Sequence, residues 1–195
     1  MGKVKGPLLS LGASGKIADT LVFMTWKGIQ DVRQHVIPAN PKTAAQQTQR
    51  GYVTDAVAEW HAAGYTATDL AALNRAAGAQ PAPMSGYNLL VKKYVACKVD
   101  GDAWQRLSNL VVSAVDHESA DVSVDAAADK SAKLYYGTSK TVMLTEVAGV
   151  FDADHYDFDV PGLSASTTYY FYIVATAAGF QGYLGIGKFT TTAAP

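Results

Sequence analysis

A glycine-rich segment near the start of the chain has some of the residues that bind phosphate. The stretch from Gly12 to Lys16 is superficially similar to a phosphate-binding loop. That motif also requires a glycine where Ser10 stands and a hydroxyl residue where Ile17 stands, so we predict no nucleotide site. We expect instead that the glycines let the segment lie flat against a neighbour, because glycine allows close backbone approach.

The densest acidic group has the oxygen ligands that calcium prefers. The spacing of an EF-hand is broken at Tyr156, where a third ligand is due. Strand alternation explains the pattern without a metal, because it turns the apolar residues inward and leaves the aspartates in water. We therefore predict no metal site. The group consists of Asp152, Asp154, His155, Asp157 and Asp159.

The histidines and the single cysteine show no catalytic arrangement. Cys97 lies near three lysines that could lower the pKa of its thiol, but no motif places a histidine and an acid beside it. No metalloprotease motif or paired carboxylates accompany any histidine. We therefore predict a protein that is not an enzyme and needs no cofactor. The histidines are His35, His61, His117 and His155.

Four residues of the N-terminal half are candidates for docking a partner. They are Trp26, Arg33, Gln46 and Arg50. Arginine and glutamine side chains could bind the backbone or the carboxylates of a partner, and a solvated helix face explains them equally well. Trp26 has a large apolar area that a lone hairpin cannot bury, so we expect the helices and another subunit to cover it.

An aromatic run in the C-terminal half could line a carbohydrate-binding surface, so a module that binds a host-surface glycan is an alternative function. It comprises residues 169–172, joined by Tyr183. Alternation of core rings and exposed rings along a strand explains the run without a ligand, and we favour that interpretation.

Residues 16–37 predict a β-hairpin. Apolar residues recur at even spacing on both sides of a turn at Lys27-Gly28. Residues 6–15 have no period and predict an extended arm. Since an isolated hairpin is marginal in water, this one needs a partner surface.

Three helices are predicted to follow the hairpin. Thr43 and Gln46 have the spacing of a capping box, and the helix that they begin should stop near Gly64. A second capping pattern starts at Thr66 and opens a helix that ends at Gly78. Ser85 can cap the third helix.

From about residue 108 the pattern changes to short alternating runs broken by turns. Seven such runs in under about ninety residues are typical of an immunoglobulin-like sandwich. The predicted strands are 110–115, 121–125, 133–136, 142–147, 156–160, 169–176 and 184–191. The sequence therefore predicts an α+β part of hairpin and helices at residues 1–105, and an all-β sandwich at residues 106–195.

The segment from Val160 to Ala175 resembles the corner of fibronectin type III domains, where a leucine lies six residues before a tyrosine. The resemblance implies that Leu163 and Tyr169 form this structural corner. The ring of Tyr169 would then lie in the core, and its hydroxyl would bond back to the backbone.

Several stretches of the N-terminal half match one pattern: Gly15 to Gly28, Val32-Arg33, Pro38 to Arg50, Trp60, and Gly86 to Leu89. Together they resemble a family of small proteins encoded in the structural gene clusters of tailed phages. The resemblance implies a virion component, assembled in the host cytoplasm, that decorates the capsid or sits at the head, with the neck or tail as an alternative station. It implies other virion proteins as partners, together with self-association.

Composition and charge exclude several classes of protein. Apolar residues make up 49% and charged residues 17%, which argues against disorder. One cysteine excludes an intramolecular disulfide. Residues 1–105 carry eleven Lys/Arg and seven Asp/Glu, and the rest carry five and ten, an asymmetry too mild for nucleic-acid binding. No apolar run approaches a membrane span, so we expect a soluble protein that is not exported.

Overall fold

The computed structural model describes residues 2–3, 14–37, 39, 42–82 and 84–195. The chain divides into two compact units, Met1–Thr43 and Ala44–Pro195, and each is described here by itself. Most of the predicted arm, residues 6–13, lies outside the described residues.

The first unit is a small antiparallel sheet. Its strands are β1 (Gly2–Lys3), β2 (Gly15–Ile17), β3 (Leu21–Trp26) and β4 (Ile29–Gln34), in the order β1-β4-β3-β2. The predicted hairpin is confirmed as β3 and β4. Its two-residue turn has positive φ at both Lys27 (50°) and Gly28 (77°), the conformation that matches the twist of a tight hairpin.

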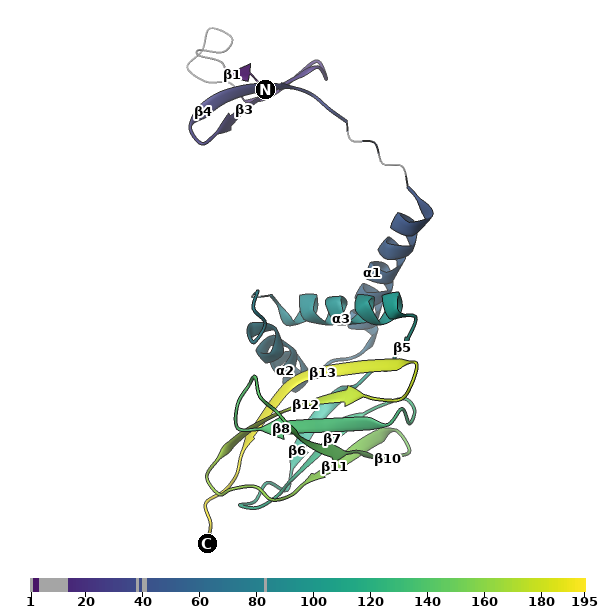
Figure 1. Cartoon of the computed structure of the whole chain (residues 1–195), viewed down its shortest axis with the longest axis vertical. Helices are drawn as coiled ribbons and strands as arrows, with labels where there is room; N and C mark the ends of the chain where they lie inside the picture. Colours follow the sequence, from purple (N-terminus) through teal and green to yellow (C-terminus); the bar gives the residue numbers. More distant parts are fainter. Residues whose placement is uncertain (1, 4–13, 38, 40–41, 83) are drawn as a thin grey trace. The chain divides into compact units, whose positions relative to one another are not determined.

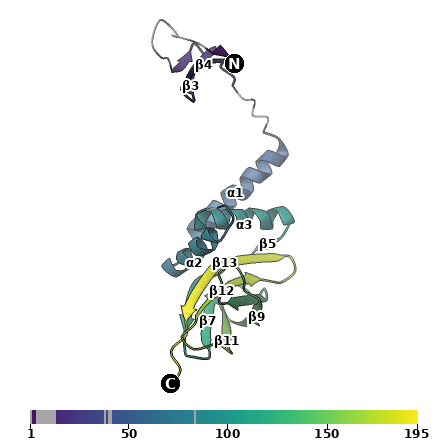
Figure 2. The ribbon, with the colours of Figure 1, turned by 60° about the vertical axis from the view of Figure 1, so that its left-hand side comes forward.

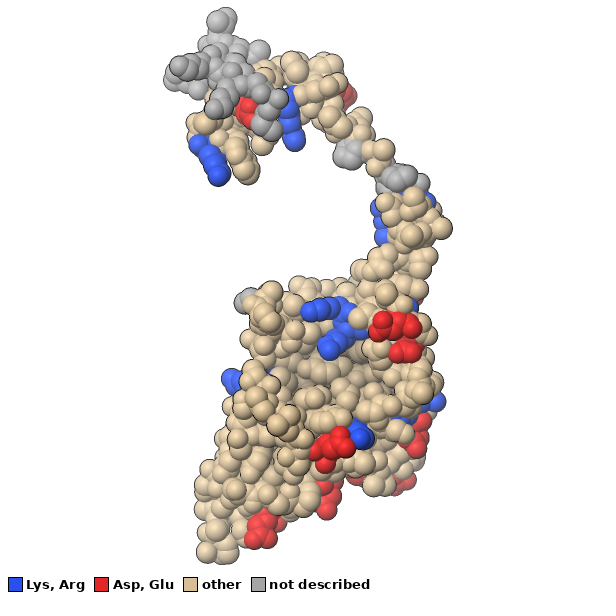
Figure 3. Space-filling view, in the orientation of Figure 1, with Lys and Arg blue, Asp and Glu red and all other residues tan. Residues whose placement is uncertain are grey.

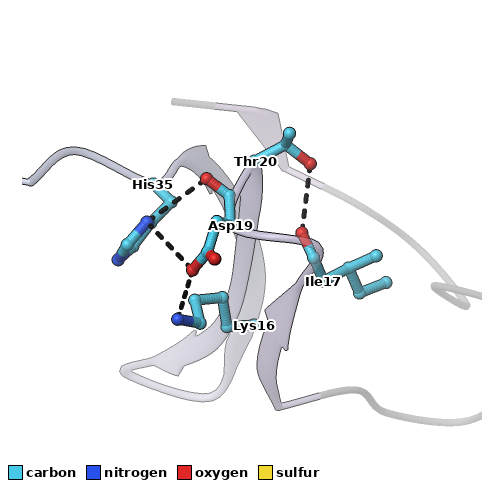
Figure 4. A network of polar contacts seen from close by, with 5 residues as sticks. All are labelled: Lys16, Ile17, Asp19, Thr20 and His35. Atoms are coloured by element: carbon cyan, nitrogen blue, oxygen red, sulfur yellow. Dashed lines mark hydrogen bonds and ion pairs between the residues drawn. The ribbon is translucent and has the colours of Figure 1, made fainter.

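The first predicted strand is interrupted, which the periodic pattern did not indicate. Ala18 and Asp19 have φ of 45° and 55° and turn the chain, so Ile17 pairs with Leu21 across β2 and β3. Figure 4 shows the contacts that hold this turn: the hydroxyl of Thr20 donates to the carbonyl of Ile17 over 3.0 Å, and Lys16 binds the Asp19 carboxylate. His35, just after β4, approaches the same carboxylate.

The second unit begins with the three predicted helices, α1 (Ala44–Ala62), α2 (Ala67–Gly78) and α3 (Gly86–Asp100). Thr66 caps α2 with the full reciprocal capping box predicted for it. The hydroxyl of Ser85 accepts from the amide of Asn88 at the start of α3. Gly101 ends that helix in the left-handed conformation.

The rest of the second unit is a β-sandwich. One sheet has the order β10-β11-β7-β6 and the other β5-β13-β12-β8-β9 (Figure 1). Apart from the short β5, this is the strand order of immunoglobulin-like sandwiches, the class that includes fibronectin type III domains. The strands are β5 (Ala103–Trp104), β6 (Ser108–Ser113), β7 (Ala120–Asp125), β8 (Ala132–Gly137), β9 (Thr145–Ala148), β10 (Val150–Asp152), β11 (His155–Val160), β12 (Thr168–Ala175) and β13 (Phe180–Thr190).

The core lies between the two sheets and follows the predicted alternation. On β11, Tyr156, Phe158 and Val160 are buried while Asp157 and Asp159 are exposed. On β12, alternate residues from Tyr169 to Ala175 face the core.

The helices belong with the sandwich, so the unit boundary differs from the one predicted near residue 105. Helix α2 packs directly on β13 (Figure 2), and a Cβ on Gly185 would lie 2.6 Å from the helix backbone at Ala72. The fully buried carboxylate of Asp69 accepts backbone N–H groups from Asn109 and Leu110 of β6. The predicted boundary was placed where the helical pattern gives way to strands, and that change in pattern contains no information on packing between a helix and a distant strand.

Candidate docking surfaces

The described residues of the first unit form no hydrophobic core. Among its described residues, no apolar side chain is buried, and the only buried residue is Asp31. A small sheet normally needs one covered apolar face for stability. The large apolar side chains that stay exposed are Ile17 (41%), Leu21 (41%), Trp26 (60%), Ile29 (46%), Val36 (70%) and Ile37 (78%).

Strand register divides the side chains of this sheet between two faces, since residues directly opposite share a face. We call one the apolar face; it carries Ile17, Leu21, Phe23 and Val32. We call the other the basic face; it carries Lys16, Val22, Met24, Trp26, Ile29, Asp31 and Arg33. Both faces have apolar side chains, which is typical of strands that are covered on two sides.

Two of the predicted docking residues, Trp26 and Arg33, lie on the basic face. Trp26 pairs with Ile29 beside the hairpin turn, and the ammonium group of Lys27 lies 5.9 Å from its ring. Arg33 is exposed and lies opposite Val22, whose other neighbour is Lys16. The two cations therefore flank one apolar side chain.

The other two predicted docking residues, Gln46 and Arg50, lie in the second unit. They belong to the first turns of α1, where the side chains are exposed, and Ala56 is the first buried residue of that helix. Further along, the ring of Trp60 packs on Tyr65 and Tyr87 at centroid distances of 5.6 and 5.2 Å. The docking residues are thus divided between two units.

Leu163 and Tyr169 adopt the corner arrangement that the fibronectin-like resemblance implied. Both side chains are buried. The hydroxyl of Tyr169 accepts a hydrogen bond from the amide of Ser164 over 2.9 Å. The ring also packs on Tyr136 of β8 and Phe189 of β13, so the corner contacts the strands on both sides of β12.

The aromatic run of β12 is shared between the core and the outer surface. Tyr172 faces outward and stacks on Tyr135 at 5.1 Å, and its other neighbour is Tyr183 at 6.3 Å. Burial raises the pKa of Tyr183 to about 12. The ammonium group of Lys93, on α3, lies 5.0 Å from the Tyr183 ring. Figure 3 shows basic side chains gathered over α3 above this mostly uncharged sheet.

The outer side of the other sheet is acidic, and we call it the acidic face. Its rows run across β10, β11, β7 and β6, and the strands of this sheet contain no lysine or arginine. The rows are Asp152, His155, Asp125 and Ser108; Val150, Asp157, Ser123 and Val111; and Asp159, Asp121 and Ser113. The period of two was visible in the sequence, but the pairing of these strands was not.

His155 is the one basic side chain among the rows of the acidic face. Its Nδ1 lies 3.0 Å from the Asp154 carboxylate and its Nε2 lies 3.3 Å from that of Asp157. The hydrogen bond with Asp154 raises the pKa of His155, and the nearby Asp157 charge adds to the effect.

A pocket of about 500 Å³ lies where α1 approaches the end of the sandwich. Glu59 on one side makes a paired ion contact with Arg106, at 2.6 and 2.7 Å. Trp104, Asp125 and Asp154 also line this pocket. Its charges are mixed, and within the described residues no group of acidic, histidine or cysteine side chains could hold a metal ion.

None of the described helices has the length and apolar character needed to cross a membrane.

No protein-family model and no curated protein matches this chain. Solved structures similar to its sandwich include a fibronectin type III domain of human collagen XX, with 22% identity and a TM-score of 0.39 over 46% of this chain and 94% of that chain. The solution structure of the fn3 domain of the human collagen alpha-1(XX) chain has 26% identity and a TM-score of 0.36, over 45% and 81% of the two chains. Domains d3-d4 of the rat CD45 extracellular region have 17% identity and a TM-score of 0.37, over 46% and 51%. We assign the sandwich on the order of its own strands.

Proposed function

We propose that this protein is a structural component of a tailed-phage particle, a capsid decoration or head-associated protein. In this proposal the first unit docks on the particle through its apolar face, and the second unit displays the β-sandwich. The resemblance of residues 15–50 to phage structural proteins supports the phage assignment. The exposure of the apolar side chains in the part of the first unit that the structure describes supports docking.

The sheet of the first unit carries this proposal, because no apolar side chain among its described residues is buried. Full burial of an Ile, Leu or Phe side chain contributes about 1.5–3 kcal/mol. Ile17 and Leu21 are each 41% exposed, so a covering surface would gain roughly 1 kcal/mol from each. Docking would therefore stabilise the sheet and attach the chain in one step.

The second unit needs no such cover. Its core contains large side chains that are almost completely buried, among them Tyr156, Phe158 and Phe171. The unit should therefore stay folded when the first unit is undocked or removed, and this makes the docking role testable by itself.

The experiment compares incorporation of the full-length chain and its variants into purified particles of the phage that encodes it, by quantitative mass spectrometry. Leu21→Asp places a charge on the apolar face and should remove the protein from particles. Val99→Asp is the matched control, because Val99 is a 62% exposed apolar residue of α3 in the second unit. Circular dichroism of both purified variants checks that the second unit remains folded.

Absence of the wild-type chain from particles would overturn the proposal, and so would normal incorporation of a chain that lacks residues 1–43. The copy number distinguishes the stations. Roughly hundreds of copies indicate capsid decoration, and about six or twelve indicate the neck or tail, because such numbers follow the symmetry of each structure.

A further inference from the structure

Charge is segregated between the two units. Residues 1–43 contain six Lys/Arg and two Asp, a net charge of +4. Residues 44–195 contain the remaining ten Lys/Arg and fifteen Asp/Glu, a net charge of −5, and the two sum to the −1 of the whole chain. Opposite net charges on two surfaces favour their encounter.

The acidic face concentrates negative charge in an arrangement that is costly for an isolated sandwich. Asp159 on β11 lies directly opposite Asp121 on β7. Like charges directly opposite in a sheet are destabilising. A cationic side chain placed between the two carboxylates would reverse this repulsion.

The same place on the acidic face is hollowed. A depression of about 360 Å³ is lined by the carboxyl-bearing residues Asp121, Asp157 and Asp159. Ser113 and Ser123 also line it. Planar guanidinium groups bind carboxylates through two parallel hydrogen bonds, so a hollow with three carboxylates suits an arginine.

The basic face of the first unit has the complementary chemistry. Arg33 is exposed on this face, and Trp26 and Ile29 supply exposed apolar area on the same face, at the turn end of the hairpin. The acidic face has exposed apolar side chains of its own, Val150 (70%) and Val111 (43%), in the row next to the hollow. Each surface therefore combines exposed apolar side chains with charged groups, and the charges on the two surfaces are opposite in sign.

We propose that the basic face of the first unit binds the acidic face of the second unit of a neighbouring copy, with Arg33 in the hollow between Asp121 and Asp159. The occupant is a second copy of this chain. The contact uses the face of the sheet opposite to the apolar face, so neighbouring copies on a particle would be linked laterally while each remains docked.

The geometry of the second unit favours the basic face of a neighbouring copy, and not that of the same chain, as the occupant of the acidic face. Its chain enters at Ala44, at the start of α1, and Glu59 lies about 22 Å further along that helix at ~1.5 Å per residue. Glu59 approaches the sandwich at the end that carries Asp125 and Asp154. The hollow lies toward the other end of the same strands, and is therefore remote from the point of entry.

The size of the sheet limits the strength of this contact. Four strands of at most six residues cover an area of roughly 20 by 20 Å, so the contact buries less than about 1,000 Å² in total. Interfaces of that size are weak in dilute solution. Docking on a particle raises the local concentration of copies, which makes weak lateral contacts effective.

The experiment measures self-association of the full chain by sedimentation velocity up to roughly 0.5 mM, a concentration suited to weak contacts. We expect concentration-dependent association at low salt that falls steeply at high salt. Arg33→Glu and Asp159→Arg should each lower the association constant at least about tenfold, and the double variant should recover most of it. Lys188→Glu makes the same charge change on an exposed lysine of β13 and should have no effect.

Three results would overturn the inference: a monomer throughout this range, an Arg33→Glu variant that associates like wild type, or a double variant no better than either single variant. These results differ from failure of the proposed function. A monomeric chain that is still incorporated into particles removes the lateral contact alone. A self-associating chain that is absent from particles removes the particle assignment alone.

Discussion

The buried carboxylate of Asp69 gives the sharpest test of how the helices are attached to the sandwich. Its Oδ2 accepts the amides of Thr66 (2.8 Å) and Asn109 (2.9 Å), and its Oδ1 accepts that of Leu110 (2.8 Å). One contact caps α2 and the other two reach β6. A register shift between Ser108 and Val111 leaves these two amides available to the carboxylate.

Asp69→Asn keeps the shape of this side chain and removes part of its bonding capacity. The amide has one acceptor oxygen, so at least one backbone N–H would face an NH₂ group. An unsatisfied buried donor costs about 1–3 kcal/mol, and the bonds that remain lose the benefit of a charged acceptor. We expect the free energy of unfolding to fall by about 3 kcal/mol, which lowers Tm by roughly 6–12 °C for a unit of this size.

Equilibrium urea unfolding, monitored by circular dichroism and by tryptophan fluorescence, measures this loss. Hydrogen exchange adds a local readout, because the amides of Asn109 and Leu110 should exchange faster in Asp69→Asn than in wild type. Asp55→Asn is the matched control on exposed α1 and should change stability by less than about 0.5 kcal/mol. A loss below about 1 kcal/mol for Asp69→Asn, or unchanged exchange at both amides, would refute this account of the attachment.

Three further predictions concern the sandwich and its acidic face. Gly185→Ala should destabilise the chain by more than about 2 kcal/mol in thermal unfolding, because φ is +117° and the new Cβ would press on the backbone of α2. Tyr169→Phe should cost about 1 kcal/mol by the same measurement, through loss of the bond from the Ser164 amide, and an unchanged Tm would contradict the corner. NMR titration should give His155 a pKa above its ordinary value of about 6.5, and Asp154→Asn should lower it. Since the folded-state pKa is raised, the stability from this contact is present below the ordinary pKa and is lost as pH rises through the raised one.

Local chemistry made much of the fold predictable. The capping box at Thr66 and the cap at Ser85 mark helix starts because their side chains satisfy amides only a few residues away. The alternation along β11 and β12 was equally readable, since a strand with one buried face shows it residue by residue. These signals depend on neighbours in the sequence and need no knowledge of the tertiary structure.

Long-range contacts were not predictable in the same way. Asp69 reads in the sequence as a capping residue, and its bonds to β6 cross forty residues of chain. The extra turn at Ala18 and Asp19 has neither the glycine nor the asparagine that usually marks positive φ. The short β5 has only two residues, too few to show a period. For Asp69 and β5 the missing information was the identity of the partner segment, and for the turn it was a residue type that marks positive φ.

Residue types alone identified two of the candidate docking residues that share a face, but they did not locate the boundary between the positive and negative parts of the chain. Exposed aromatic and basic side chains pointed to Trp26 and Arg33, and register now places both on one face of one sheet. The sequence put the change of charge near residue 105, but residues 44–105 carry five basic and five acidic residues and are neutral. The excess of positive charge therefore belongs wholly to the first unit.

The excess of negative charge is equally localised, since the acidic face alone carries five aspartates and no lysine or arginine. A charge imbalance that served solubility alone would be spread over the surface. A positive excess in the first unit, together with an acidic face on a stable sandwich, is the pattern expected of two surfaces that meet. Because the small sheet has a second, apolar face, it can hold a neighbouring copy and a supporting surface at the same time.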